Sequence, residues 1–180
     1  MQWEPGALAI LGAALVTAHL FALVVGGING PAFTAALRKL LDANNRDRAI
    51  KLTNAAPRAH LALIWRAGLE ASLERRADEG ESLVREVLRE SVEGALAKER
   101  RRVRRAALLS LAGAVAAAVA ASIAYSGQAT PPGAVTGFIL AAGAGALLGW
   151  HRTNRLLAGL KSSAAQLVED LTAYVMRGGA

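Results

Sequence analysis

Apolar residues in this chain gather into three long blocks, and charged residues fill the sequence between them. The first block, 6–28, has no formal charge and would reach roughly 34 Å as an α-helix, enough to cross a hydrocarbon core of about 30 Å. The second block, 106–125, and the third, 132–150, also lack formal charge and have the length of a membrane-spanning helix. We therefore predict three transmembrane helices, of which the last two form a hairpin through the short connection SGQATP.

A cleavable signal peptide is the main alternative for the first block. Signal peptides carry positive charge before their apolar region. Here the preceding MQWEPG contains Glu4 and no Lys or Arg, whereas Arg38 and Lys39 follow the block. The pattern favours a retained membrane span.

The distribution of cations predicts the orientation in the membrane. Seventeen of the 21 Lys and Arg lie in 32–105, four follow Trp150, and none precedes the first span. Cationic segments stay on the cytoplasmic side, so we expect the N-terminus outside and the C-terminus inside. Trp3 and Tyr125 then fall at the outer interface and Trp150 at the inner one, as in an aromatic belt.

A basic run, KERRRVRR at 98–105, leads directly into the second block. Nucleic-acid binding would require cations mixed with aromatic residues or a recognisable module, and neither is present, so we expect no nucleic-acid partner. Long Arg side chains at an inner interface instead reach anionic lipid headgroups and water. The expected interface anchors are Trp150 and four arginines, Arg101, Arg102, Arg104 and Arg105.

Helical periodicity covers most of the segment between the first and second blocks. Pro31 can open a short helix through Leu41, and a turn is expected at Asn44–Asn45. Pro57 can open a longer helix, because apolar residues three or four positions apart follow it on one face. These residues are Leu61, Ile64, Trp65, Leu69 and Leu73.

A turn near Gly80 precedes a long stretch without proline. We predict one helix from about Glu81 to Ala124, with a break near Gly94 as the alternative. The tail carries a second apolar stripe, spaced 4, 4, 3, 4 and 4 residues apart, which predicts a helix that continues the third span and packs on other helices. Its members are Leu156, Leu160, Ala164, Leu167, Leu171 and Val175.

The composition agrees with an all-α integral membrane protein. The chain has 180 residues, is 53% hydrophobic, carries a formal net charge of +7 and contains no Cys, which excludes disulfides, thiolate zinc sites and cysteine nucleophiles. Three scattered His and the absence of HExxH or GxSxG motifs give no reason to expect an enzyme, a metal or a cofactor. The expected organisation is an outer N-terminus with the first span (1–30), a cytoplasmic helical segment (31–105), the hairpin (106–150) and a cytoplasmic helix (151–180).

This layout resembles the MotA/TolQ/ExbB family of membrane stator and proton-channel subunits from end to end. The stretch DANNRDRAIKLTNAAPRAHLALIWRAGLEAS (42–72) is similar to the family's short helix, proline and following segment. ALLSLAGAV (107–115) is similar to the family's PLLGLLGTV at the start of its second span. GAGALLGWHRTNRL (143–156) is similar to the end of its third span, where an Asn follows the membrane, here Asn154.

The resemblance implies a homo-oligomer, a pentamer, in the bacterial inner membrane. The second and third spans of such a ring line a central passage. Two copies of a single-span partner of the ExbD/TolR/MotB type sit inside it, and an Asp of the partner accepts the translocated proton. Ion flow is then turned into movement of the partner or of the ring.

Several residues depart from the family pattern. The family's Pro, Gly and Thr at the start of the second span are Ala107, Ser110 and Ala114 here. The resemblance gives that Thr the hydroxyl that faces the partner's carboxylate. A second family Thr on the third span corresponds to 139–142, which has no hydroxyl.

A proton path through hydrocarbon requires groups that exchange hydrogen bonds, or water held by them. The candidates for an ion path are Ser110, Ser122 and Thr136, with Ala114 at the position of the family's pore threonine. Packing through back-bonded hydroxyls would leave the same three polar residues. Three hypotheses therefore stay open: a conducting subunit, a non-conducting paralogue that forms a similar ring, and an unrelated three-span scaffold.

His19 is the one ionisable residue within the three predicted spans, near the middle of the first. Ionisable residues inside a membrane are functional candidates, and His titrates in the physiological range. The first span lies outside the passage in the resembling family. We therefore favour a neutral His19 that is hydrogen-bonded to Thr17 or a neighbouring helix.

Small residues recur in both hairpin spans. GAGALLG (143–149) imitates a dinucleotide-binding fingerprint but lies within an apolar span with no preceding strand. Rows of small residues four apart instead let helices approach closely, as a multi-subunit bundle requires. The expected packing residues are Gly113, Ala117, Ala121, Gly145 and Gly149.

Overall fold

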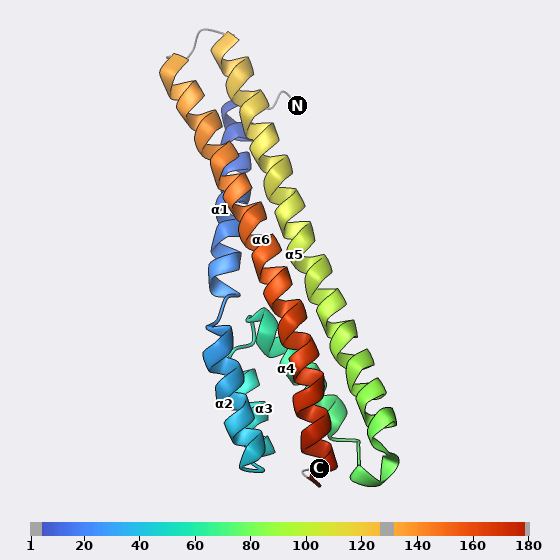
Figure 1. Cartoon of the computed structure of the whole chain (residues 1–180). Helices are drawn as coiled ribbons and strands as arrows, with labels where there is room; N and C mark the ends of the chain where they lie inside the picture. The colour runs from blue at the N-terminus through green and yellow to red at the C-terminus, as the bar shows by residue number, and fades with distance from the viewer. Residues whose placement is uncertain (1–4, 127–131, 179–180) are drawn as a thin grey trace. The chain divides into compact units, whose positions relative to one another are not determined.

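The computed structural model describes residues 5–126 and 132–178, and these ranges form helices without any strand (Figure 1). Helix accounts for 88% of the structure, which confirms the prediction of an all-α chain. The elements are α1 (Pro5–Val25), α2 (Gly30–Asp42), α3 (Arg46–Asn54), α4 (His60–Ser72), the 3₁₀ turn η1 (Ala77–Glu79), α5 (Glu81–Ser126) and α6 (Pro132–Met176).

The helices form two compact units. Unit 1 comprises Met1–Val24 and Arg101–Leu156, and unit 2 comprises Val25–Arg100 and Leu157–Ala180. The long helices α5 and α6 contribute residues to both. The packing inside each unit is described separately below.

The short helices of unit 2 agree closely with the sequence pattern. Asn29 caps α2 by accepting a hydrogen bond from the backbone N–H of Ala32 at 3.3 Å. The expected turn at Asn44–Asn45 separates α2 from α3, and Asn44 has a positive φ of 51°. Helix α4 begins at His60 rather than at Pro57, because Ala59 is extended, with φ −78° and ψ 122°.

The long helix predicted from Glu81 is confirmed. Gly80, with φ +88°, makes the expected turn, and α5 then runs without interruption to Ser126. Gly94 lies within this helix, so the alternative of a break there is wrong. Near the start of this helix, Arg85 forms an ion pair with Glu81, four residues earlier, at 2.8 Å.

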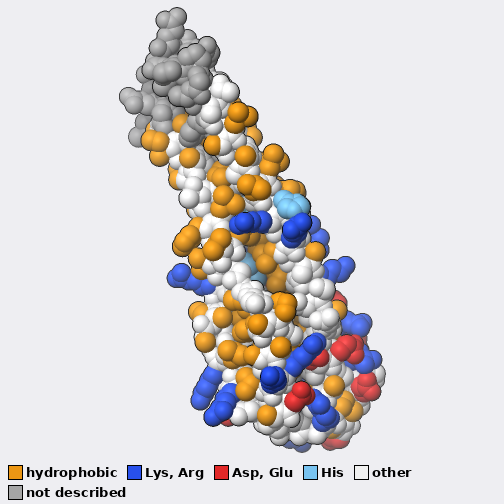
Figure 2. Space-filling model, turned by 60° about the vertical axis from the view of Figure 1, so that its left-hand side comes forward, with side chains coloured by type: hydrophobic (Ala, Val, Ile, Leu, Met, Phe, Trp, Pro, Cys, Tyr) orange, Lys and Arg blue, Asp and Glu red, His pale blue; other side chains and the backbone are white. Residues whose placement is uncertain are grey.

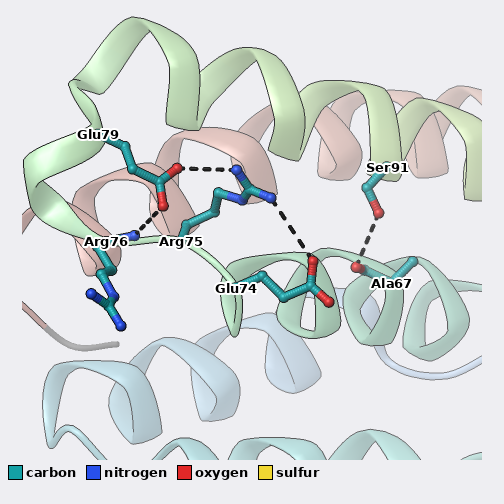
Figure 3. A network of polar contacts seen from close by, with 6 residues as sticks. All are labelled: Ala67, Glu74, Arg75, Arg76, Glu79 and Ser91. Carbon is teal, nitrogen blue, oxygen red and sulfur yellow. Dashed lines mark hydrogen bonds and ion pairs between the residues drawn. The ribbon is translucent and has the colours of Figure 1, made fainter.

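Polar contacts hold the turn between α4 and α5 (Figure 3). Arg75 lies 3.0 Å from Glu79 and 3.8 Å from Glu74. The second carboxylate oxygen of Glu79 accepts a hydrogen bond from the backbone N–H of Arg76 at 3.1 Å. On α5, the Ser91 hydroxyl donates to the Ala67 carbonyl of α4 at 3.1 Å. These contacts fix α4 against the start of α5 within unit 2.

The core of unit 2 surrounds α4. Trp65, Ile64 and Leu69 are fully buried, whereas Leu73 is 43% exposed because it follows the last residue of the helix. Gly68 lets α4 approach its neighbours, since a Cβ there would lie 2.7 Å from Leu171 and 3.1 Å from Val92. The α5 and α6 side chains buried in this unit include Val84, Leu88, Val92, Leu160, Ala164, Leu167, Leu171 and Val175.

In unit 1, α1 packs closely on α5 and α6. A Cβ on Gly12 would overlap the carbonyl oxygen of Gly113, and a Cβ on Gly145 would lie 3.0 Å from the Val16 side chain. Val16 belongs to a buried cluster with one residue of α5 and two of α6, and Leu20 packs against it. We call this cluster, formed by Val16, Ala114, Ala142 and Ala146, the apolar layer.

Two segments of the described chain are long and apolar enough to cross a membrane: Ala9–Asp42, which contains most of α1 and all of α2, and Glu81–Ile123 of α5. The third predicted span, 132–150, begins α6 but is not one of these two. Several of its side chains fall outside the described residues. The described residues therefore support two candidate spans, where three were predicted. The side chains of Trp3 and Tyr125 also lie outside them.

Candidate functional site

A layer of polar side chains adjoins the apolar layer of unit 1. Contacts of His19 with Gly149 and of Val16 with Gly145 show that α1 and α6 run in the same direction. Contacts of Gly12 with Ala117 and of Leu15 with Gly113 show that α5 runs in the opposite direction.

One helical turn beyond the apolar layer, each helix places a different residue at the next level. These are His19 of α1, three residues after Val16, Ser110 of α5, four residues before Ala114, and Gly149 of α6, three residues after Ala146. Because three or four residues make one turn, these positions share one level. Thr153 of α6, one turn beyond Gly149, contacts His19. We call His19, Ser110 and Thr153 the polar layer.

The His19 ring is held by α6. Its Nε2 lies 3.3 Å from the Thr153 hydroxyl, and both residues are buried, with 5% and 1% of their surface exposed. A Cβ on Gly149 would lie 3.0 Å from the ring Cδ2, so glycine leaves the space that the imidazole occupies. The ring is therefore positioned by a hydroxyl on one side and a bare helix backbone on another.

Two polar atoms of this layer have no hydrogen-bond partner among the described residues: Nδ1 of His19 and the hydroxyl of Ser110, which is 2% exposed. Several other helical hydroxyls bond back to their own helix, as Thr17 does to the Ala13 carbonyl and Ser122 to the Ala118 carbonyl, both at 2.9 Å. Ser110 makes no such bond. Unpaired buried polar atoms are rare in proteins, so this layer is the candidate functional site of unit 1.

The residues predicted to line an ion path do not share one surface. Ser110 is buried in the polar layer, and Ala114 is buried in the apolar layer against Val16. Ser122 and Thr136 are exposed. The position aligned with the family's pore threonine therefore faces α1 within the chain.

His19 is bonded to a neighbouring helix, which is one of the two partners that the sequence analysis left open. The expectation placed it near the middle of the first span, bonded to Thr17 or to a neighbouring helix. The structure gives it Thr153 of α6, which follows Trp150, the expected inner end of the third span. Sequence reasoning did not select Thr153 because it lies beyond the apolar block. Its spacing of four residues from Gly149 was the available signal.

The predicted packing residues lie between helices of a single chain. Gly113, Ala117, Ala121 and Gly149 are buried and Gly145 is half-buried. A Cβ on Gly113 would lie 2.9 Å from the Cβ of Leu15 of α1. These small residues therefore bring α1 onto α5 and α6, where a contact between subunits was expected. Gly12, the α1 side of this approach, was missed because it is an isolated glycine in an apolar run.

The expected interface anchors lie on the surface. Arg101, Arg102, Arg104 and Arg105 are exposed, and Trp150 is 41% exposed. No Asp or Glu occurs between residues 101 and 156. The 101–156 segment of unit 1 therefore contains basic residues and no acidic ones.

Unit 2 contains a buried ionisable pair that the sequence did not reveal. His60 Nδ1 lies 2.7 Å from the Glu99 carboxylate, and their side chains are 11% and 6% exposed. The backbone N–H of His60 also donates to the Gly26 carbonyl at 3.3 Å. The pair links the first residue of α4 to α5.

Over residues 5–126 and 132–178, no three His, Asp or Glu side chains are close enough together to hold a metal ion. Comparison with known proteins yields no relative: no family model, no curated protein and no solved structure matches this chain.

Proposed function

We propose that this chain is a non-enzymatic integral membrane subunit of a homo-oligomeric complex of the MotA/TolQ/ExbB stator type. Several copies, a pentamer by resemblance, surround a single-span partner in the bacterial inner membrane. The chain crosses the membrane three times, with its N-terminus outside and its C-terminus inside, and 31–105 and 151–180 lie in the cytoplasm. The observation that carries the proposal is the reversed placement of large and small apolar side chains in unit 1.

Helix α5 displays this reversal. Its buried face carries small residues at spacings of three and four, namely Ala107, Ser110, Ala114, Ala117 and Ala121. Its opposite face carries Leu108, Leu111, Val115 and Val119, which are 55%, 42%, 59% and 54% exposed. Apolar surface left in water costs roughly 25 cal/mol per Å², whereas lipid tails remove that cost. A face of large aliphatic residues outside a small-residue core is typical of membrane helices.

The other helices of unit 1 follow the same rule. On α1, Ile10 and Phe21 are 73% and 67% exposed, and on α6, Leu140 and Leu147 are each 67% exposed. In Figure 2, hydrophobic side chains are dense directly below the grey atoms, and Lys and Arg appear farther down the face. Lipid or a neighbouring subunit would cover these surfaces.

The non-conducting form of such a subunit is the second candidate, and one observation favours it. Ala114 stands where the resembling family has its pore threonine, and it is buried among apolar side chains of the same chain. A carboxylate on a partner would find no hydroxyl there. The ring would then serve as a structural element without proton translocation.

The experiment that tests the proposal is a native mass measurement on the complex, extracted gently from its own membrane, with every co-purifying chain identified. Several identical copies around fewer copies of a single-span protein with a membrane Asp are expected. A monomer, or a homo-oligomer without such a partner, would overturn the stator assignment.

Proton flux in liposomes separates the two candidates. If the complex conducts, Ser122→Ala abolishes the flux, because Ser122 carries an exposed hydroxyl within the second predicted span. If it is the non-conducting paralogue, the wild-type complex shows no flux above that of empty liposomes.

A further inference from the structure

We propose that the polar layer is an internal hydration site of unit 1. Water bridges His19 Nδ1 and the Ser110 hydroxyl and exchanges protons with the imidazole, and the apolar layer ends the hydrated path. This inference rests on the membrane position proposed above and not on the oligomer or its partner.

The need for water follows from the two unpaired atoms. His19 Nδ1 and the Ser110 hydroxyl are buried, lie on different helices at the same level, and lack a partner in the described part of the chain. Leaving such groups unpaired in a low-dielectric interior costs about 1–3 kcal/mol each. A buried water molecule removes this cost when it finds two or more polar partners.

The imidazole can meet both neighbours in its neutral form. One ring nitrogen of neutral His is a donor and the other is an acceptor. With the proton on Nε2, the ring donates to the Thr153 hydroxyl, 3.3 Å away, and Nδ1 accepts from the water. The Ser110 hydroxyl, which is not bonded back to its helix, can accept from or donate to the same water. Thr153 therefore positions the ring, and Ser110 positions the water.

Because no carboxylate is supplied by the segments around His19, water is its principal route for proton exchange. Neither α1 nor the 101–156 segment contains an Asp or Glu, so neither supplies a carboxylate to accept its proton. On the neighbouring helices, Arg105 precedes Ser110 by five residues, and His151 and Arg152 directly precede Thr153; all three side chains are exposed. These lie on the Thr153 side of the layer, which would face the cytoplasm.

The opposite side of the layer is closed. Val16, Ala114, Ala142 and Ala146 are at most 8% exposed and carry no side-chain group that exchanges hydrogen bonds. A chain of water would be interrupted there. Within one chain, the site is therefore closed on the side of the apolar layer.

The first test uses the full-length chain in lipid bilayers with ¹⁵N-labelled histidine. Magnetisation transfer from water to the His19 ring is measured by solid-state NMR, with assignment through His19→Asn. We expect efficient transfer in the wild type and several-fold slower transfer in Ser110→Ala. The matched control is Ser122→Ala, which removes an exposed back-bonded hydroxyl and leaves the transfer unchanged. A dry His19 ring in the wild type, or equal transfer in Ser110→Ala, would overturn the proposal.

The second test exploits the absence of cysteine from the chain. Single variants Ser110→Cys and Ala114→Cys are reacted with silver ion, which reaches thiols through water. We expect Ser110→Cys to react several-fold faster than Ala114→Cys, because only the former lies in the hydrated layer. Equal rates would refute a boundary between the layers.

Arg105→Cys distinguishes a failure of this inference from a failure of the proposed membrane position. It should react with a membrane-impermeant thiol reagent from one side of the bilayer only. If it does so while Ser110→Cys is inert, the membrane position stands and the hydration site is refuted. If Arg105→Cys reacts equally from both sides in sealed vesicles, the proposed topology is refuted instead.

Discussion

In unit 2 the buried side chains are mostly large, such as Trp65, Leu69 and Leu167, whereas in unit 1 they are mostly alanine. The exposed surfaces differ in the opposite sense. All the exposed large hydrophobic side chains of the described residues belong to unit 1, except Val25, Leu73 and Leu83. The same chain therefore uses two packing rules, and the boundary between them runs through α5 and α6.

The charges of the two units differ in the same way. In unit 2, cations of one helix meet acids of another: Arg38 lies 2.7 Å from Asp170, and Arg177 lies 3.1 Å from Asp42. The 101–156 segment of unit 1 has cations and no acids. Large buried residues and paired charges suit water, whereas small buried residues, large exposed ones and cations without acids in the same segment suit the lipid bilayer with anionic headgroups that is proposed for unit 1. Both units are helical, so the contrast lies in which side chains are buried and which are exposed. This difference supports the proposal that the two units have different surroundings.

The largest effect is expected from removing the central aromatic residue of unit 2. Trp65→Ala should lower the free energy of unfolding by about 3–5 kcal/mol, because it leaves a cavity in a packed core. Denaturant titration of the purified chain, followed by circular dichroism, measures this. Trp150→Ala removes the same side chain from an exposed position of unit 1 and should change stability by about 0.5 kcal/mol or less. Equal effects of the two variants would remove the contrast between the units.

A charge on the apolar face of α5 tests the surroundings of unit 1. Val115→Arg should cost about 2.5–3.5 kcal/mol of apparent insertion free energy, as cations do near the centre of a span. A microsomal insertion assay measures it. Leu83→Arg, at a position that is 46% exposed in unit 2, should leave insertion unchanged. Normal insertion of Val115→Arg would contradict the proposed lipid contact.

Two glycines of unit 1 are expected to respond to alanine with opposite signs. Gly12→Ala should destabilise the chain by about 1–3 kcal/mol, because its Cβ overlaps the Gly113 carbonyl and forces α1 away from α5. Gly143→Ala meets nothing within 4 Å and should stabilise α6 by up to about 1 kcal/mol through helix propensity. Thermal unfolding in detergent micelles decides the sign, and a stabilising Gly12→Ala would disprove the close approach.

The smallest effects compare two side-chain contacts of equal length in unit 2. His60–Glu99 and Arg66–Glu70 both span 2.7 Å, but the first is buried and the second is about half exposed. Glu99→Leu should cost about 1–3 kcal/mol, because it leaves the His60 Nδ1 buried without this partner. Glu70→Leu should cost about 0.5 kcal/mol or less. Denaturant titration again measures both, and equal losses would show that burial of the His60 pair is unimportant.

Residue order along the chain determined the helices of this protein and most of their ends. Proline, glycine and asparagine at local positions predicted the start of α2, the Asn44–Asn45 turn and the Gly80 turn, and apolar spacing predicted the buried stripe of α6. The uninterrupted α5 followed from the lack of any helix-breaking residue. Such features depend on neighbours within one or two turns, so a pattern along the chain contains them.

Tertiary structure alone decided which side chains meet. His19 and Thr153 are 134 residues apart, and His60 and Glu99 are 39 apart. Their contacts depend on how far one helix slides along another, and a displacement of one turn would give each a different partner. The apolar spacing of α1, α5 and α6 tolerates several such displacements. The close backbone approach at Gly12 and Gly113 selects one of them, and this selection buries Ser110 and Ala114 on the face toward α1.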